Sequence, residues 1–279
     1  MVRPNDYYDI DLNAHTLRSF VMFIGFGRSG HSIVGQIINA HPNALIADEA
    51  PIFDELGRSP SLEQTIDYLK ERDRAFALRW FNKDSPIHRS APLSRLFRPR
   101  GKRRNFRFPG LYQGFVKLPS VIGNSKAGYT SRHIAQDPHL IPAYEESVGL
   151  PMKFVCIMRN PFDMIASGMR RREASFDDIC SNFEEMSDYV QRSLSNLGDR
   201  PVLMLRQEDF LSDASAGIDR LFSFLELPVA TDFKDIIRGR LFTEPQKSRY
   251  GNPAVAENRA RVETLIAKHD FFEGYSYDS

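Results

Sequence analysis

The sequence predicts an α/β fold in which a parallel β-sheet is flanked by helices, within a single domain that carries an insertion. Short apolar runs alternate with amphipathic stretches along the chain, a pattern typical of strand and helix units wound into a parallel sheet. The length of 279 residues, with 42% hydrophobic residues, lies near the upper end of what one core supports. We therefore expect one domain over residues 1–279, with residues 83–110 as a basic loop insertion.

The expected elements follow from periodicity and from helix start and stop signals. Apolar runs predict strands at 20–24, 44–47, 114–118, 153–158 and 202–205. Apolar faces at helical spacing predict helices at 31–40, 62–81, 161–172, 176–197, 214–225 and 254–268. Residues 85–110 are rich in Pro, Gly and Arg without periodicity, which predicts a long excursion from the core. The last ten residues are expected to form a loose tail.

Composition and charge exclude several classes of protein. The formal net charge is +1, from 37 basic and 36 acidic residues, so the overall balance favours neither nucleic acid nor an anionic membrane as a partner. The early apolar run at 20–26 is too short to span a bilayer. Two cysteines cannot build a disulfide framework, and Cys156 lies in an apolar run. These features predict a soluble, cytoplasmic protein in a reducing compartment.

The first motif is a small, Gly-rich segment, G-F-G-R-S-G-H-S, which follows one predicted strand and opens a helix at 31. Backbone N–H groups of such a loop, together with the partial positive charge of a helix N-terminus, suit a bound phosphate. The segment matches a P-loop-type pattern except that His31 stands where the lysine would be. The candidate anion-binding residues are Gly27, Arg28, Ser29, Gly30, His31 and Ser32. On this segment alone, a Gly-rich turn that binds nothing is the alternative.

The second motif, R-N-P-F-D-M-I-A-S, begins with Arg159 after another apolar run. Pro161 suits the first turn of a helix, and Asp163, Ser167 and Arg171 share one face of that helix. Arg159 at the strand end could then meet Ser167 and Arg171 around one phosphate. An ordinary helix start with an ion pair is the alternative explanation.

Together the two motifs resemble those of the sulfotransferase family, in the branch that contains Golgi-type and bacterial enzymes, including the protein-tyrosine and carbohydrate sulfotransferases. The resemblance implies that the first motif holds the 5'-phosphosulfate of 3'-phosphoadenosine 5'-phosphosulfate, and that Arg159 and Ser167 hold its 3'-phosphate. It extends to residues 40–50 and to the R-Q-E-D-F segment at 206–210, where Gln207 replaces the usual tyrosine. A weaker match at 245–250 implies that Lys247, Ser248 and Arg249 help to bind the nucleotide.

The same resemblance implies catalytic roles. Glu49 takes the place of the family's general base, with Asp48 as the competing choice. Arg28 and His31 are the candidates for stabilising charge on the leaving oxygen during an in-line transfer without metal. His31 departs from the threonine that is commoner at this position. Lys117 could point into the same crevice or be an ordinary strand-end lysine.

The acceptor is left open. Residues 95–107 contain seven basic side chains, which could form a rim for an anionic acceptor or a solvated basic loop. A hydroxyl or amine on a small molecule, glycan or peptide would fit. Two other function classes are a magnesium-dependent nucleotide kinase or triphosphatase, which the absent loop lysine disfavours, and a nucleotide-binding scaffold without turnover.

Overall fold

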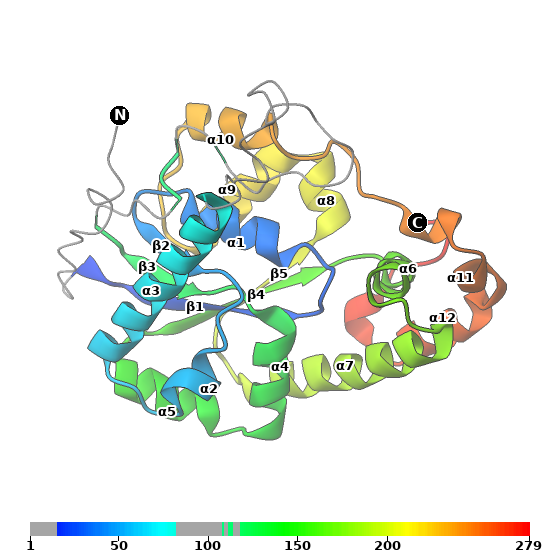
Figure 1. Cartoon of the computed structure of the whole chain (residues 1–279), viewed down its shortest axis with the longest axis horizontal. Helices are drawn as coiled ribbons and strands as arrows, with labels where there is room; N and C mark the ends of the chain where they lie inside the picture. Colours follow the sequence, from blue (N-terminus) through cyan, green and yellow to red (C-terminus); the bar gives the residue numbers. More distant parts are fainter. Residues whose placement is uncertain (1–15, 82–107, 109–110, 114–117) are drawn as a thin grey trace.

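The computed structural model describes residues 16–81, 108, 111–113 and 118–279, and its centre is a parallel β-sheet (Figure 1). Across the described residues the sheet has five strands in the order β2-β3-β1-β4-β5, and every neighbouring pair is parallel. The strands are β1 (Ser19–Gly25), β2 (Ala44–Ala47), β3 (Val121–Asn124), β4 (Met152–Met158) and β5 (Val202–Arg206). Since β1 is central, the loop that follows it opens at the middle of the sheet's carboxyl edge. The predicted α/β class is confirmed.

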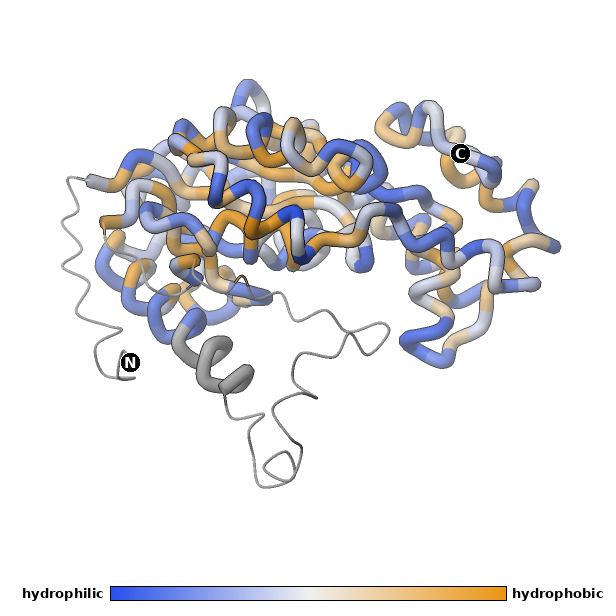
Figure 2. Tube along the Cα trace, turned by 90° about the horizontal axis from the view of Figure 1, so that it is seen from above, coloured by the Kyte–Doolittle hydropathy of each residue, from blue (hydrophilic) through white to orange (hydrophobic). Residues whose placement is uncertain are grey.

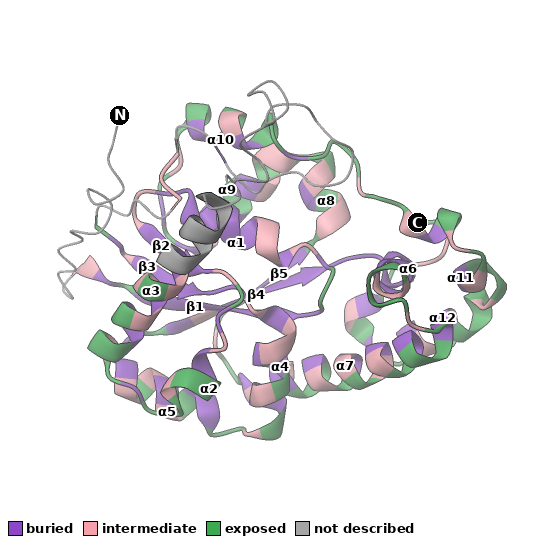
Figure 3. Ribbon diagram, viewed as in Figure 1, coloured by how far each residue is buried: buried purple, intermediate pink, exposed green. Residues whose placement is uncertain are grey.

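The side chains of β1 alternate between two hydrophobic clusters, one on each face of the sheet. Phe20, Met22 and Ile24 belong to one cluster, and Val21 and Phe23 belong to the other. The whole strand is buried, as expected for a parallel sheet that is covered on both faces. Figure 2 shows hydrophobic stretches running through the interior, and Figure 3 shows the strands as buried.

Helices cover both faces of this sheet (Figure 1). On one face lie α1 (His31–Asn39), α8 (Gln207–Ser212), α9 (Ala214–Phe224) and α10 (Thr231–Arg238). The other cluster is covered by α2 (Ile52–Leu56), α3 (Leu62–Phe81), α4 (Ala127–Gln136), α5 (Leu140–Val148) and α7 (Phe176–Asn196). α3 also packs along the edge strand β2.

A group of elements, α6 and several from the C-terminal part of the chain, gathers beyond the end of β4 (Figure 1). These elements are α6 (Pro161–Arg172), the 3₁₀ turn η5 (Ser248–Gly251), α11 (Pro253–Glu257), α12 (Arg259–Ile266) and the 3₁₀ turn η6 (Asp270–Phe272). Because α6 begins just after β4, this group adjoins the sheet's carboxyl edge.

Two predicted elements differ in place or extent. The strand expected at 114–118 is wrong for Leu118, which is outside any strand, while 114–117 lie outside the described residues. The strand is Val121–Asn124, where a Cβ on Gly123 would lie 1.9 Å from the carbonyl oxygen of Val21, so only glycine permits the pairing. The helix expected at 254–268 is two helices, α11 and α12, separated at Asn258.

The prediction of a loose C-terminal tail is wrong. Phe272 is 2% exposed and Tyr275 is 9% exposed, and both belong to the hydrophobic cluster that also contains α6 and α7. The aromatic side chains of this segment bury too much apolar surface to remain in solvent.

The basic insertion at 83–110, including the segment 95–107, lies outside the described residues except for Phe108. Lys117 also lies outside them. No helix within the described ranges is both long enough and apolar enough to cross a bilayer.

Candidate active site

The loop between β1 and α1 adopts the backbone conformation that an anion-binding turn needs. Gly30, the residue before α1, has a φ of 101°, and Arg28 has a φ of 72°, so both lie in the left-handed region. A Cβ on Gly27 would meet nothing within 4 Å, so its backbone borders open space. Among the described residues no side chain caps α1, so its N-terminal N–H groups suit a ligand.

Aromatic side chains hold this loop from behind. The ring of Phe26 stacks on Phe183 of α7 and packs against Phe272, with both centroid distances at 5.4 Å. Ser29 is buried, and its hydroxyl donates to the carbonyl oxygen of Phe26 at 2.9 Å. The Ser29 hydroxyl thus stabilises the loop by a contact within the loop itself. The backbone N–H groups of the loop are then the groups that could contact a ligand.

The second motif is positioned by β4 and the start of α6. Asn160 is the N-cap of α6, where its side chain accepts a hydrogen bond from the backbone N–H of Phe162 at 3.0 Å, and Pro161 opens the first turn. Arg159, only 6% exposed, projects from the end of β4. Ser167 lies within α6 and is 1% exposed.

The two motifs meet directly, although they are far apart in the sequence. The Nε of Arg28 donates to the Oγ of Ser167 at 3.1 Å, across 139 positions of chain. The Nη1 of Arg159 donates to the carbonyl oxygen of Arg28 at 3.2 Å. The loop, the end of β4 and α6 therefore form one continuous surface.

This surface carries positive charge that nearby carboxylates do not fully balance. Loss of hydration lowers the pKa of Arg28, and the charges of Arg171, Arg159 and Arg170 lower it further. Burial likewise lowers the pKa of Arg159, against the opposing influence of Asp163. The Nε of Arg159 is buried and has no hydrogen-bond partner among the described residues. An anionic ligand would satisfy this donor and relieve the repulsion.

Glu49 follows β2 and reaches the start of α1. Its Oε1 lies 2.9 Å from the Nε2 of His31 and 3.4 Å from the Oγ of Ser32. Its φ is 52°, a strained value for a non-glycine residue. Burial acts to raise the pKa of Glu49, but the hydrogen bond and charge of His31, with the charge of Lys126, bring that pKa below its ordinary value.

Asp48 lies in a different environment from its neighbour. Its Oδ1 accepts a hydrogen bond from the Oγ of Ser125 at 3.0 Å. Burial and then the charge of Glu49 raise the pKa of Asp48 to about 6. The environments of the two carboxyl groups therefore shift their pKa values in opposite directions.

The side chains of the 245–250 segment contact other residues of the chain. Arg249 is 1% exposed, and its Nη1 lies 2.6 Å from the Oδ2 of Asp163, with its backbone N–H donating to Oδ1 at 2.9 Å. Lys247 is exposed, with its Nζ 6.0 Å from the ring centroid of Tyr250. The backbone N–H of Ser248 donates to the Gln246 carbonyl. A donor-binding role for these three residues stays a prediction.

Two cations near the site escaped the sequence reasoning. Lys126 follows β3, and its charge acts to lower the pKa of Glu49. The charge of Arg170 acts to lower the pKa values of Arg28 and Arg159. Lys126 could have been found from the polar triplet Asn124, Ser125 and Lys126 at the end of a strand. The sequence analysis expects that strand at 114–118, whereas β3 is Val121–Asn124.

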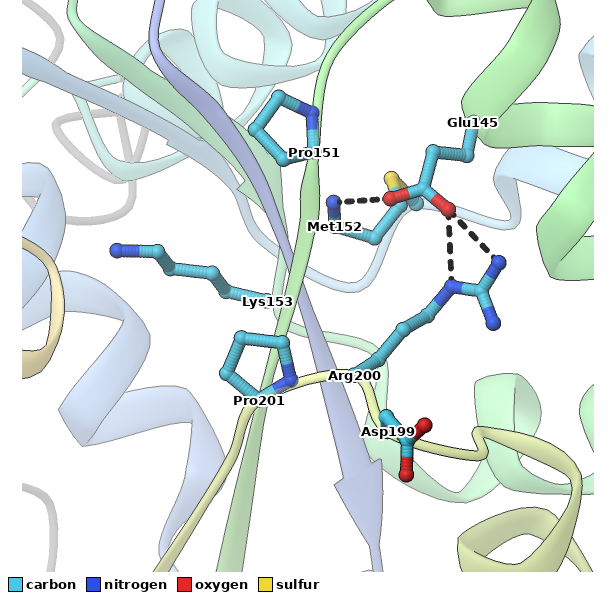
Figure 4. Close-up of a pocket in the computed structure, with 7 residues that line it drawn as sticks. All are labelled: Glu145, Pro151, Met152, Lys153, Asp199, Arg200 and Pro201. Carbon is cyan, nitrogen blue, oxygen red and sulfur yellow. Dashed lines mark hydrogen bonds and ion pairs between the residues drawn. The ribbon is translucent and has the colours of Figure 1, made fainter.

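A surface pocket in the described part of the chain lies at the opposite, amino edge of the sheet (Figure 4). It is lined by Glu145, Pro151, Met152, Lys153, Asp199, Arg200 and Pro201. Glu145 and Arg200 form an ion pair there with oxygen to nitrogen distances of 2.7 and 2.9 Å. This pocket is remote from both motifs and takes no part in the site.

Residues 18–270 match the model of the sulfotransferase domain. The chain belongs to the sulfotransferase family. The match includes both motifs and Glu49, so this sulfotransferase carries its candidate active site within the family's domain. A sequence comparison with curated proteins gave no match.

Solved structures of several other proteins are similar to this one at low identity. A sulfotransferase from Mycobacterium avium is 12% identical, with a TM-score of 0.47, and the alignment covers 91% of this chain and 77% of that one. A sulfotransferase from Alicyclobacillus acidocaldarius is 19% identical, with a TM-score of 0.41 and coverages of 90% and 96%. A retinol dehydratase solved with androsterone and the inactive cofactor PAP is 14% identical, with a TM-score of 0.44 and coverages of 92% and 82%.

Proposed function

We propose that this sulfotransferase moves a sulfuryl group from 3'-phosphoadenosine 5'-phosphosulfate to a hydroxyl or amine of a small-molecule, glycan or peptide acceptor. The observation that carries the proposal is the hydrogen bond from Arg28 to Ser167, at 3.1 Å, because it joins the two anion-binding motifs into one site. A donor with phosphate groups at both ends of a ribose requires two such anion sites close together.

The residues present fit this donor. Arg159, with its unpartnered Nε, and Ser167 would hold the 3'-phosphate through charge-assisted hydrogen bonds. The loop backbone from Gly27 to Ser32 and the N-terminus of α1 would hold the 5'-phosphosulfate end. Arg171 and Arg170 add positive charge around the same site.

The donor supplies the sulfuryl group, and the chain's own residues position it and manage charge and protons. Arg28 and His31 lie at the loop and at the first residue of α1, where they would stabilise charge on the oxygen that leaves. Glu49 would take the proton from the acceptor. When Glu49 is ionised, the Nε2–H of His31 donates to it and fixes the direction of its carboxylate.

Geometry favours Glu49 as the general base, whereas the pKa favours Asp48. The pKa of about 6 at Asp48 matches a general base better than the lowered pKa of Glu49. However, Asp48 is tied to Ser125, whereas Glu49 is half-exposed and contacts His31 at the head of α1. Geometry decides first for a proton acceptor, so we assign the role to Glu49.

The assignment of the base predicts different outcomes for two isosteric variants. Glu49→Gln should lower kcat by about 100- to 10,000-fold, because general-base assistance is lost, while affinity for adenosine 3',5'-bisphosphate stays within twofold. Asp48→Asn should lower kcat by less than about tenfold. Steady-state kinetics with a responsive acceptor would measure both, and the opposite ranking would transfer the role to Asp48.

The donor assignment is tested by calorimetric titration with adenosine 3',5'-bisphosphate in EDTA, with ATP plus magnesium as the comparison ligand. Tight metal-free binding of the bisphosphate alone supports the donor site. Preference for ATP with magnesium would refute it and favour a kinase.

We also infer a reducing compartment such as the cytoplasm, since Cys156 and Cys180 are both free and buried. Cell fractionation that found the protein in an oxidising compartment would contradict this.

A further inference from the structure

Two side chains of the R-Q-E-D-F segment at the end of β5, Arg206 and Glu208, contact the C-terminal segment. The guanidinium carbon of Arg206 lies 4.7 Å from the ring centroid of Tyr275. The hydroxyl of Tyr275 donates to the Oε2 of Glu208 at 3.0 Å. Arg206 also donates to the carbonyl oxygen of Glu273. Arg206 and Glu208 therefore hold one buried tyrosine, Arg206 at the face of its ring and Glu208 at its hydroxyl.

Glu208 passes this restraint to the start of α6. Its second oxygen, Oε1, accepts a hydrogen bond from the backbone N–H of Asn160 at 2.8 Å. Asn160 directly follows Arg159, so a displacement of their shared peptide would move the arginine that faces the phosphate site. The charge of Glu208 also reaches Arg159, where it acts to raise a pKa that burial lowers.

The C-terminal segment holds Asn160 from a second side. The Nδ2 of Asn160 donates to the carbonyl oxygen of Ser276 at 2.9 Å and to the Oγ of Ser279 at 3.0 Å. The backbone N–H of Asn160 thus bonds to Glu208, its Nδ2 to the C-terminal segment, and its Oδ1 to the first turn of α6. Such saturation leaves the peptide little freedom to move.

The same segment touches the other parts of the proposed donor site. Phe272 packs on Phe26 of the anion-binding loop at 5.4 Å between centroids. Tyr277 contacts Phe162 of α6 at 5.4 Å and Tyr250 of the 245–250 segment at 5.6 Å, both edge to face. Residues 272–279 therefore connect segments that are far apart in the sequence but meet around one ligand site.

We propose that Glu208 and Tyr275 are positioning residues for the donor clamp, which hold Asn160 and thereby place Arg159 for the 3'-phosphate. The proposal rests on the proposed donor. Both residues would act through the protein: Glu208 accepts from the backbone N–H of Asn160, next to Arg159, and Tyr275 donates to Glu208. Their effect is expected on donor affinity rather than on the transfer step.

The test compares Tyr275→Phe with Tyr189→Phe, a matched control. Each substitution removes one tyrosine-to-glutamate hydrogen bond and keeps the ring, but Tyr189 bonds to Glu185 on the exposed side of α7. Calorimetry with adenosine 3',5'-bisphosphate should give a Kd about three- to tenfold higher for Tyr275→Phe, since a displaced clamp weakens a charge-assisted bond without abolishing it. Tyr189→Phe should bind like the wild type, and kcat at saturating donor should change less than about twofold in both.

Glu208 provides a second pair of variants. Glu208→Gln keeps an oxygen that accepts from Asn160 and should restore most of the affinity that Glu208→Ala loses. Hydrogen exchange of a peptide spanning 158–162, measured without ligand, should be faster in Tyr275→Phe and Glu208→Ala than in the wild type, because the Asn160 N–H loses its restraint.

Unchanged Kd and unchanged exchange in Tyr275→Phe would overturn the proposal, as would an equal loss of affinity in Tyr189→Phe. Failure of the donor assignment has a different signature: the wild type itself would not bind the bisphosphate. In that case faster exchange at 158–162 in the variants would still support the positioning role, and unchanged exchange would refute it.

Discussion

Replacing Asp163 by asparagine would remove one charge from an ion pair in which both side chains are 1% exposed. The Oδ2 of Asp163 lies 2.6 Å from the Nη1 of Arg249. In Asp163→Asn the retained oxygen can still accept from the Arg249 backbone N–H, which lies 2.9 Å from Oδ1. The variant therefore isolates the loss of the carboxylate charge and leaves a buried guanidinium without its counterion.

The size of the effect follows from that burial. Breaking a buried pair by removing one partner costs about 3–5 kcal/mol, because the remaining charge cannot recover its hydration. For a domain of this size, 1 kcal/mol corresponds to about 2–4 °C in Tm, so the expected decrease in Tm is about 6–20 °C. Arg249→Met should destabilise by a similar amount. The double variant should cost about 1–3 kcal/mol less than the sum of the two, since it leaves no unpaired charge.

Urea unfolding monitored by circular dichroism, with calorimetric Tm values, would measure the cycle. Asp177→Asn is the matched control, since Asp177 pairs with Arg261 at the surface, where the side chains are 76% and 46% exposed. That variant should lose less than about 1 kcal/mol. A loss below about 1 kcal/mol in Asp163→Asn, or a loss equal to the control, would refute the reasoning and free Arg249 for a direct role in donor binding.

Two further predictions concern the site. Ser167→Ala should raise the Kd for adenosine 3',5'-bisphosphate about tenfold, or ~1.4 kcal/mol, because a buried hydroxyl that meets Arg28 is lost; calorimetry would measure it, and an equal change in Ser195→Ala, an exposed serine of α7, would contradict it. Asp48→Asn should alter the pH dependence of stability. The pKa of Asp48 rises from 3.8 to about 6 on folding. The free energy of unfolding of the wild type is therefore highest, relative to the variant, below pH 3.8. It falls by up to about 3 kcal/mol relative to the variant as the pH rises through about 6, because the folded state resists ionisation of Asp48. Urea unfolding from pH 4 to 8 would detect this, and a pH-independent difference would contradict it.

Local signals in the sequence were sufficient for the parts of the site that a single segment forms. The Gly-rich turn before α1 and the Pro161 start of α6 were predicted at the correct places, because glycine conformation and proline geometry act within a few residues. The α/β class followed in the same way, from alternating strand and helix patterns. The prediction failed at β3, whose short run includes Gly123, and periodicity alone does not reveal a close strand contact.

Contacts between distant segments were less accessible. The sequence predicts that Arg249 helps to bind the nucleotide, which stays a prediction, but it gave no sign that Arg249 pairs with Asp163 in the interior. The sequence predicted a loose tail for the last ten residues, yet Phe272 and Tyr275 belong to the hydrophobic cluster that contains α6 and α7, and Phe272 packs on Phe26 of the Gly-rich loop. Whether a polar side chain faces solvent, a ligand or a buried partner depends on what the rest of the chain brings near it.

The sequence by itself therefore determined the fold class and the positions of the Gly-rich loop and of the start of α6, which carry the two candidate phosphate motifs, because these depend on backbone preferences and hydrophobic period over short stretches. Only the tertiary structure decided that Arg28 meets Ser167, that His31 faces Glu49, and that the C-terminal segment holds Asn160. Those pairings arise when burial removes competing water from side chains that are remote in the sequence, so their strength and their choice of partner appear only in the packed molecule.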